Sequence, residues 1–590
     1  MTAPIRVANC SGFFGDRLSA AREMVEGGPI DVLTGDWLAE LTMLILARTR
    51  EKRPGGGYAR TFVTQMEEVM GSCLDRGIKV VSNAGGLDPR GCAEAVASVA
   101  SHLGLDPVIA YVDGDDLLPQ IDELVAGGAL GAFEANSLGD SRSYVTANAY
   151  LGCWGIVDAL ERGADIVVTG RVTDAAVTCG PAAWHHSWAR DDWDALAGGV
   201  VAGHVIECSA QATGGNYSFF TEIPGYADPE RARLGFPWAE IDANGNSVIG
   251  KHHGTGGLVS IGTVTSQLLY EIGGPAYLGP DVTARFDTIE LSEAGTDRVR
   301  IQGVRGEAPP PTLKVAINEL GGYRNEFALA LTGVDIEEKA AFAQAAFWNA
   351  CPYGPGDYAS VTSRVVRTDK PNAATNEEAT AVWRLSVKDS DERRVGRAFS
   401  NAAIETALGS IPGFYALTGG PAPARPYGVY RAATVPAGHV PQHVHILGGE
   451  TSTVHSVAPP SALAVEARPG PDALVPGGPT VAIPLGKVIG ARSGDKGGNA
   501  NLGVFARTDA AWAWLNDFLT SEKLRELLPE LERLRIDRYR LANLRSLNFV
   551  IHGLLEEGVA ASTRQDPQAK SLGEWLRARV VDLPEALIAD

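Results

Sequence analysis

The chain is poor in the features that define several large classes of protein. Its 590 residues include only seven cysteines, an odd count without a CxxC pair, which argues against a disulfide framework and predicts reduced thiols in a cytoplasmic protein. No uninterrupted apolar run is long enough to cross a bilayer, and no apolar signal region follows Met1. The sequence contains neither GxGxxG nor GxxxxGKS/T, which disfavours enzymes that bind nicotinamide, flavin or ATP.

Positive charge is also in short supply. The chain has 51 basic and 71 acidic side chains, for a net charge of −20. This balance disfavours a large nucleic-acid or anionic-membrane surface, so we expect neither kind of partner. An anionic substrate would need a local basic or amide-rich pocket. The length predicts roughly two to four domains of an ordinary globular protein.

Five short apolar runs in the first part of the chain have the length and β-branching of buried parallel strands. They begin at Ile5, Ile30, Ile78, Val108 and Ile166, and helix-like stretches separate them. Strands joined by helices form right-handed crossovers. We therefore predict an α/β fold with a parallel sheet that is covered on both faces.

Small and polar residues follow each of these strands. Open α/β sheets bind ligands at the carboxyl ends of their strands, which predicts a lined crevice at this edge. The residues expected to line it are Ser11, Thr34, Asp36, Asn83, Gly85, Thr169, Arg171 and Asp174. Turns need such residues for their own conformations, so each case alone also fits a plain loop.

The stretch 207–216 places a carboxylate, a thiol and an amide ahead of a Gly-Gly turn. Glu207, with Gln211 and Asn216 as amide partners, is a candidate acid or base that moves a proton beside a carbonyl. Cys208 is a candidate nucleophile if His204 acts as its base, although no helical context is clear here. A buried structural cysteine is the alternative for Cys208.

Histidines provide two further candidates. His252 is a candidate general acid or base, and Thr255 with its glycine neighbours offers donors to a phosphate or carboxylate. The adjacent His252 and His253 cannot readily share one metal in a regular element, so we expect no metal site from this pair. His443 and His445 have a strand spacing that metals do use, but no acidic or cysteine partner follows them.

The character of the sequence changes after residue 284. Segments between 285 and 456 follow the order strand, helix, strand, strand, helix, strand, which is that of the ferredoxin-like split motif. Residues 457–480 have the proline and glycine content of a linker. We predict a parallel α/β domain over 1–284, an α+β domain over 285–456 and a small domain over 481–590.

The small domain carries a glycine-rich stretch with two basic side chains, from Arg492 to Asn501. We predict a loop whose Arg492 and Lys496, with Asn499 beside them, cup an anion. A tight hairpin with purely structural glycines is the alternative.

Several of these stretches together resemble one known family. The motifs of the acyclic terpene utilisation AtuA family are similar to Asn9-Cys-Ser-Gly-Phe-Phe-Gly-Asp, Val168-Thr-Gly-Arg-Val-Thr-Asp, Glu207-Cys-Ser-Ala-Gln-Ala-Thr-Gly-Gly-Asn, His252-His-Gly-Thr-Gly-Gly and Gln267-Leu-Leu-Tyr-Glu. The stretch Arg492-Ser-Gly-Asp-Lys-Gly-Gly-Asn-Ala-Asn resembles the small ferredoxin-like domain that is often fused to that family.

The resemblance implies a role in the bacterial breakdown of branched acyclic terpenoids, whose intermediates are coenzyme A thioesters. We therefore expect a C–C lyase or hydratase acting on an acyl-CoA, with no cofactor besides the coenzyme A of the substrate, and a homo-oligomer. Glu207, Asp36, His252 or Cys208 would be catalytic. Asn83, Thr169 and Arg171 would hold the thioester oxygen or a distal carboxylate. The alternatives are a non-catalytic acyl-CoA-binding or scaffold subunit, and a metal-dependent hydrolase that uses Asp36, Asp174 and His252.

Overall fold

The computed structural model describes residues 2–53, 55–133, 138–229, 232–417, 421–456, 466–471 and 473–588. The chain divides into two compact units, the first made of Met1–Asn318, Tyr430–Val559 and Gln568–Asp590, and the second of Glu319–Val429 and Ala560–Pro567. The boundary predicted after residue 284 lies inside the first unit. Residues 457–465 and 472 of the predicted linker lie outside the described residues.

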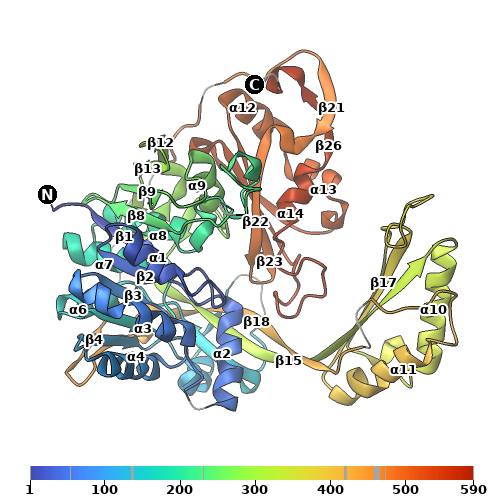
Figure 1. Ribbon diagram of the computed structural model, residues 1–590, viewed down its shortest axis with the longest axis horizontal. Helices are drawn as coiled ribbons and strands as arrows, with labels where there is room; N and C mark the ends of the chain where they lie inside the picture. The colour runs from blue at the N-terminus through green and yellow to red at the C-terminus, as the bar shows by residue number, and fades with distance from the viewer. Residues whose placement is uncertain are drawn as a thin grey trace. The chain divides into compact units, whose positions relative to one another are not determined.

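An eleven-stranded sheet forms the centre of the first unit, in the order β12-β13-β9-β8-β1-β2-β3-β7-β4-β19-β20 (Figure 1). The five predicted strands are its parallel centre: β1 (Ile5–Asn9), β2 (Val32–Gly35), β3 (Lys79–Ser82), β7 (Ile166–Thr169) and β4 (Ile109–Asp113). Antiparallel strands extend it on both sides: β8 (Pro237–Ile241), β9 (Ser247–Lys251), β13 (Arg298–Gln302), β12 (Glu290–Glu293), β19 (Gln442–Ile446) and β20 (Thr451–Val454). The predicted α/β fold is confirmed.

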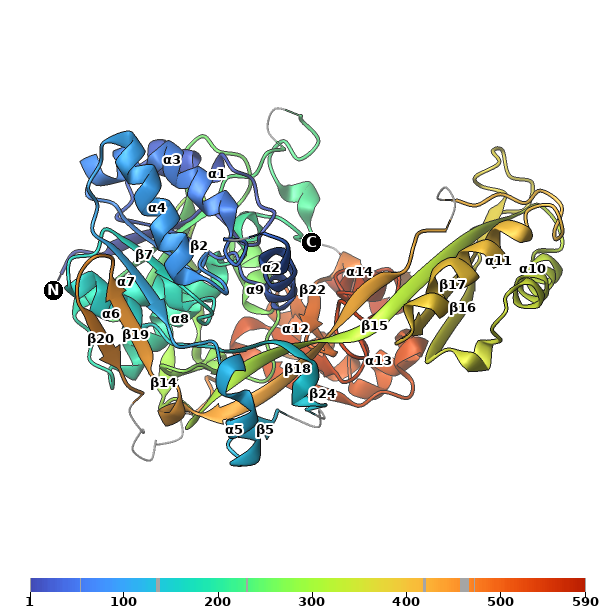
Figure 2. The ribbon, with the colours of Figure 1, turned by 90° about the horizontal axis from the view of Figure 1, so that it is seen from below.

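Helices cover both faces of the parallel strands (Figure 2). One face carries α1 (Ala20–Gly27), α3 (Arg60–Asp75) and α4 (Pro89–Leu103), which share one hydrophobic core. The other face carries α6 (Trp154–Glu161), α7 (Ala176–His186) and α8 (Trp193–Ile206), which share a second core. The neighbouring strands β3 and β7 thus lead to helices on opposite faces. Such a change of face is where α/β sheets bind ligands.

A three-stranded sheet and a terminal domain with two antiparallel sheets complete the first unit. The three-stranded sheet consists of β10 (Ala276–Leu278), β11 (Thr283–Arg285) and β14 (Arg305–Glu307). The terminal domain has an antiparallel sheet of β22 (Ile489–Lys496), β23 (Asn499–Ala506), β25 (Ser546–Ile551) and β24 (Ile536–Leu541), with helices α12 (Asp509–Phe518), α13 (Ser521–Leu527) and α14 (Leu572–Arg577). Its β21 (Thr480–Pro484) pairs with β26 (Val580–Pro584). Phe505, Leu541 and Leu544 of this domain pack into the second core of the large sheet.

The second unit has the strand and helix order that the sequence predicts. The elements are β15 (Thr312–Thr332), α10 (Ile336–Ala350), β16 (Ser360–Val366), β17 (Thr380–Asp389), α11 (Phe399–Glu405) and β18 (Arg425–Pro436). Their order across the sheet is β16-β17-β15-β18, and Phe347, Trp383 and Phe399 fill the core beneath it. The ends of β15 and β18 that lie in the first unit pair with β6 (Tyr144–Ala149) and β5 (Gly131–Ala132), respectively.

No helix among the described residues combines the length and the apolar character that crossing a bilayer requires.

Candidate active site

Arg171 follows β7 and is fixed by contacts with several other segments. Its backbone N–H donates to Oδ2 of Asp115 (2.9 Å), Nη1 donates to the carbonyl of Leu38, and Nη2 lies 2.7 Å from Oδ1 of Asp174. The guanidinium carbon lies 4.1 Å from the ring centroid of Tyr150, a cation–π contact. Because the side chain is only 3% exposed, these contacts define a single orientation of the guanidinium group at the edge of the sheet.

Asp36 and Asn83 follow the neighbouring strands β2 and β3 and contact each other. Nδ2 of Asn83 donates to Oδ1 of Asp36 (2.5 Å), which also accepts the backbone N–H of Leu38 (3.0 Å). Burial raises the pKa of Asp36, the charge of Asp174 raises it further, and Arg171 lowers it. The polar residues that follow β2, β3 and β7 therefore act on one another at one edge of the sheet.

Glu207 lies at the end of α8 with one carboxyl oxygen unpaired. No helix is evident from the sequence here, yet α8 continues through Ile206 and places His204 one turn before Glu207. Nδ1 of His204 lies 3.3 Å from Oε1 of Glu207, and both side chains are buried. Within the part of the chain that the structure describes, Oε2 of Glu207 and both ring nitrogens of His204 have no hydrogen-bond partner.

Burial sets the protonation of these two groups. It raises the pKa of Glu207 well above its ordinary value, while Asp174 and Glu271 raise it further and Arg171 lowers it. Burial also lowers the pKa of His204 to about 4. At neutral pH the imidazole of His204 is therefore uncharged, and the carboxyl group of Glu207 keeps its proton to a higher pH than an ordinary glutamate does. A carboxylic acid kept neutral in this way can donate a hydrogen bond or a proton to a bound carbonyl group.

Glu271, Tyr270 and Lys570 belong to the same region and were not predicted as site residues. Glu271 adopts a positive φ of 56°, and its backbone N–H donates to Oδ1 of Asn501 (2.8 Å). Its Oε1 lies 3.3 Å from Nζ of Lys570, which also donates to the hydroxyl of Tyr270. Tyr270 and Glu271 belong to a motif quoted for the family resemblance. Nothing in the sequence around Lys570 points to the site.

Four carboxyl groups and one guanidinium form what we term the acid cluster: Asp36, Arg171, Asp174, Glu207 and Glu271. Burial is the largest cause of the raised pKa of Asp36, Asp174 and Glu207, and each is raised further by another carboxylate of the cluster. Asp36, Asp174 and Glu207 therefore hold their protons to higher pH than exposed carboxyl groups do. Groups with such shifted pKa values are typical of sites that transfer protons.

The glycine-rich stretch of the terminal domain is a hairpin rather than the predicted loop. Lys496 of β22 pairs with Asn499 of β23, so only Gly497 and Gly498 form the turn. Nζ of Lys496 donates to the carbonyl of Glu271 (3.2 Å), and Oδ1 of Asn499 accepts the backbone N–H of Gly553 (2.9 Å). The alternating pattern of a strand is hidden here because glycine and small polar residues occupy most positions.

A cavity of about 330 Å³ lies beside this hairpin in the first unit. Its lining comes from residues 216–218 and Phe220, from residues 491–493 of β22 and from Lys570, Gly573 and Glu574. Asn216, which adopts a positive φ of 57°, and Arg492 both line it, as two of the predicted binding residues. Nη2 of Arg492 donates to Oε1 of Gln211, and the guanidinium carbon lies 4.0 Å from the ring centroid of Tyr270.

The hydroxyl groups predicted at the strand ends bind the backbone of the protein itself. The side chains of Ser11, Thr34 and Thr169 donate to backbone carbonyl oxygens at 3.1, 3.3 and 2.9 Å, respectively. Gly85 packs so closely that a Cβ atom there would lie 2.5 Å from the carbonyl oxygen of Thr169. These four residues shape the edge of the sheet on which Arg171 and Asn83 stand.

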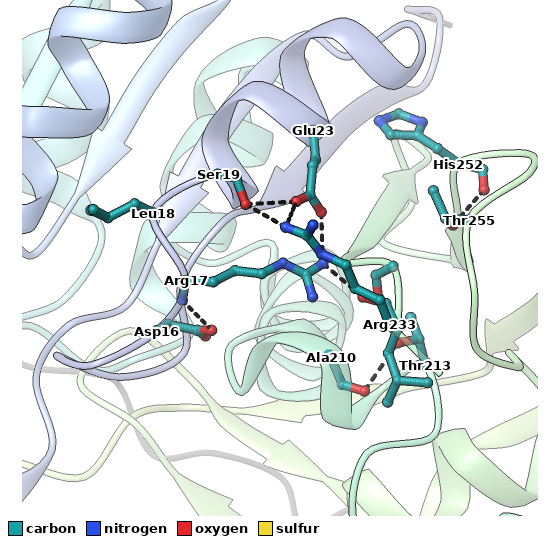
Figure 3. A network of polar contacts seen from close by, with 12 residues as sticks. Asp16, Arg17, Leu18, Ser19, Glu23, Ala210, Thr213, Arg233, His252 and Thr255 are labelled. Carbon is teal, nitrogen blue, oxygen red and sulfur yellow. Dashed lines mark hydrogen bonds and ion pairs between the residues drawn. The ribbon is translucent and has the colours of Figure 1, made fainter. Parts of the chain in front are cut away.

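His252 and Thr255 lie beside α1 in a separate polar network (Figure 3). Nε2 of His252 donates to a carbonyl of α1 (3.0 Å), and the hydroxyl of Thr255 donates to the carbonyl of His252 (2.7 Å). In the same network Glu23 forms ion pairs with Arg17 (2.7 Å) and Arg233 (2.5 Å). The structure does not bring His252 to the acid cluster, because the turn after β9 packs its ring against the end of α1.

Cys208 follows Glu207 and is held as a protonated thiol. Burial raises its pKa well above the ordinary value, and Glu207 and Glu271 raise it further, while Arg492 lowers it. A nucleophilic cysteine needs the opposite, a lowered pKa and a hydrogen-bonded base. The ring nitrogens of His204 make no such bond within the described residues. The environment therefore favours the structural alternative for this cysteine.

The described residues contain no group of three or more His, Cys, Asp or Glu side chains arranged to hold a metal ion. His443 and His445 instead contact the hydroxyls of Thr453 (3.2 Å) and Thr451 (2.9 Å) through Nδ1. The hydrolase alternative would need His252 beside the two aspartates of the acid cluster, and the structure places it in the separate network of Figure 3.

Two family models match this chain, one over its larger N-terminal range and one over the terminal domain. A family model described as acyclic terpene utilisation family protein AtuA matches residues 5–446. A second model, described as the AtuA ferredoxin-like domain, matches residues 483–582. No match is found among curated proteins. The acid cluster lies in the first matched range, and the hairpin with Arg492 lies in the second.

Proposed function

The chain belongs to the acyclic terpene utilisation AtuA family, and from this membership we propose that it is an enzyme acting on a branched acyl-CoA thioester. The proposed reaction is a C–C cleavage or a hydration. Both reactions need a proton to be moved next to the thioester carbonyl, and both develop negative charge on its oxygen. A site for either therefore needs a proton donor, a base and a group that holds the substrate in register.

The unpaired, buried carboxyl oxygen of Glu207 carries this proposal. A buried polar atom without a partner costs roughly 1–3 kcal/mol, so native proteins rarely keep one without a use. Burial raises the pKa of Glu207, which favours the protonated form, and its carboxyl group would donate to the thioester oxygen as charge develops there. Asp36, oriented by Asn83, would be the second proton-transfer group.

Arg171 and Lys314 would supply positive charge for an anionic group of the substrate. The Arg171 guanidinium carbon and Lys314 Nζ lie 4.1 and 4.8 Å from the ring centroid of Tyr150. A distal carboxylate would otherwise be repelled by the acid cluster. Arg171, which is held by Asp174 and by the carbonyl of Leu38, is suited to anchoring charge rather than to moving protons.

The test is a comparison of Glu207→Gln with wild type on a panel of branched acyl-CoA thioesters, followed by mass spectrometry. We expect wild type to convert at least one thioester and Glu207→Gln to lose roughly 10²–10⁴-fold in turnover, the range for removal of a general acid. Glu240→Gln is the matched control, because Glu240 pairs with Arg6 (2.5 Å) in the same sheet, away from the acid cluster.

Two outcomes would change the conclusion. A chain that alters no thioester, and that coenzyme A does not stabilise against heat, would overturn the proposal. Stabilisation by coenzyme A without turnover, kept in Glu207→Gln and in Asp36→Asn, would favour the non-catalytic binding subunit instead.

A further inference from the structure

We propose that the cavity beside the hairpin of the terminal domain is a binding site for an oxyanion, either a phosphate or a carboxylate, with Arg492 as its principal ligand. The site is formed jointly by residues of both matched family regions. Naming an acyl-CoA substrate as the carrier of that oxyanion rests on the proposed function; the presence of the oxyanion site does not.

The first argument is that Arg492 is buried without a counter-ion. Only 4% of the residue is exposed, and the sole hydrogen bond of its side chain within the described residues is the one that Nη2 donates to Gln211. None of the ion pairs among those residues involves it. A buried charge is normally paired, and Arg171, which is similarly buried, has Asp174 as its partner. The remaining donors of Arg492 suit a bidentate oxyanion supplied by a ligand.

The second argument is that a second cation lies on the same aromatic ring. The Arg492 guanidinium carbon and Lys570 Nζ lie 4.0 and 4.6 Å from the ring centroid of Tyr270, and both residues line the cavity. An oxyanion in the cavity would lie near both cations, and Arg492 would supply the larger attraction, because Lys570 also contacts the carboxylates of Glu271 (3.3 Å) and Asp495 (3.4 Å). The carboxylate of Glu574, which also lines the cavity, is neutralised by Arg577 at 2.7 Å.

The third argument is that the cavity adjoins the acid cluster. Lys570 contacts Oε1 of Glu271 (3.3 Å), and Glu271 is a member of that cluster. Cys208, the residue after Glu207, is close enough to Arg492 to feel its charge. A ligand with its oxyanion at Arg492 would thus present the adjoining part of the molecule toward Glu207. In a protein with a net charge of −20, such a local cationic pocket gives an anionic substrate a place to bind.

The test uses the full chain and measures binding by calorimetry with two probes, coenzyme A and glutarate, with pantetheine as a phosphate-free reference. We expect Arg492→Gln to weaken binding of at least one oxyanion probe tenfold or more, and Lys570→Gln to weaken it in the same direction. Loss confined to coenzyme A assigns the site to a phosphate, and loss confined to glutarate assigns it to a carboxylate. Arg507→Gln is the matched control, because Arg507 also stacks on an aromatic ring, that of Phe219 (4.8 Å), but pairs with Glu222 (2.5 Å).

The proposal is overturned if wild type binds neither probe, or if Arg492→Gln and Lys570→Gln both bind them as wild type does. Thermal unfolding of each variant shows whether it is folded. If Arg492→Gln does not fold, the binding measured for Lys570→Gln decides whether the proposal stands. Glu207→Gln should keep the binding of both probes. If turnover is unaffected by Glu207→Gln while Arg492→Gln loses binding, the oxyanion site stands and the proposed proton transfer by Glu207 falls.

Discussion

Oε1 of Glu207 and Nδ1 of His204 lie 3.3 Å apart at the end of α8, with both side chains buried. Since burial raises the pKa of Glu207 and lowers the pKa of His204 to about 4, the proton of this pair resides on the carboxyl group. An exposed pair of the same residues would be an ion pair between about pH 4.5 and 6.5, where glutamate is ionised and histidine is protonated. Burial thus keeps the proton on the carboxyl group of Glu207, whereas exposure to water would favour the ionised carboxylate.

Replacing His204 with phenylalanine should remove a pH dependence of stability. The ring centroid of His204 lies 5.2 Å from that of Tyr277 and 5.4 Å from that of Phe286. Its nitrogens have no hydrogen-bond partner among the described residues, so a phenyl ring can take its place. As pH falls from 6.5 toward 4, the unfolded chain takes up a proton at His204 that the folded chain does not, so wild type loses stability in this window.

Between pH 7.5 and 5, the unfolding free energy of wild type should fall by about 2 kcal/mol more than that of His204→Phe. Urea unfolding at the two pH values measures the difference. Other titrating groups contribute equally to both proteins and cancel. An identical pH dependence of the two would show that His204 does not need to be neutral in the fold.

A pair of glycine substitutions tests the close packing at the strand ends. Gly85→Ala should destabilise the protein by roughly 1–3 kcal/mol, because the new Cβ would lie 2.5 Å from the carbonyl oxygen of Thr169. Gly71→Ala in α3 should stabilise it by about 0.5–1 kcal/mol, because its nearest neighbour is a Leu105 methyl group at 3.9 Å. Thermal unfolding of the two variants should shift in opposite directions, and a shift in the same direction would contradict the packing described here.

The buried contacts of Arg171 should be far more important to stability than those of a surface arginine. Arg171→Met would leave Asp174 without its partner and remove the donor to the carbonyl of Leu38, at a cost of roughly 3–5 kcal/mol. Arg22→Met, which breaks an exposed pair with Glu68 at 2.9 Å, should cost under about 1 kcal/mol. Chemical denaturation of both variants gives the comparison, and costs of similar size would argue against the role assigned to burial.

Cys208 should be dispensable for turnover. Because burial raises its pKa well above the ordinary value, its thiolate is scarce at neutral pH, and Cys208→Ala should keep the rate within about threefold of wild type. Iodoacetamide at pH 8 should label Cys208 slowly, as peptide mass spectrometry would show. A loss of turnover of 10³-fold in Cys208→Ala would instead restore the nucleophilic role that the sequence allowed.

The parallel strands could be predicted because each is a short β-branched run. The polar residues after β2, β3 and β7 meet because parallel strands end at one edge of the sheet. Helix α8 could not be predicted, since it is buried on nearly all sides and lacks the amphipathic period by which helices are recognised. His252 was misplaced because its position depends on how the turn after β9 packs against α1. The position of Lys570 at the site could not be predicted from the sequence for a similar reason, because its hydrogen-bond partner Tyr270 is 300 residues away in the chain.

Phe505, Leu541 and Leu544 of the terminal domain complete a core that belongs to the large sheet. Expressed alone, either matched family region would expose its side of that core to water and would tend to aggregate. If the chain is split at a point between residues 466 and 480 and the two pieces are produced together, they should therefore assemble without a covalent link.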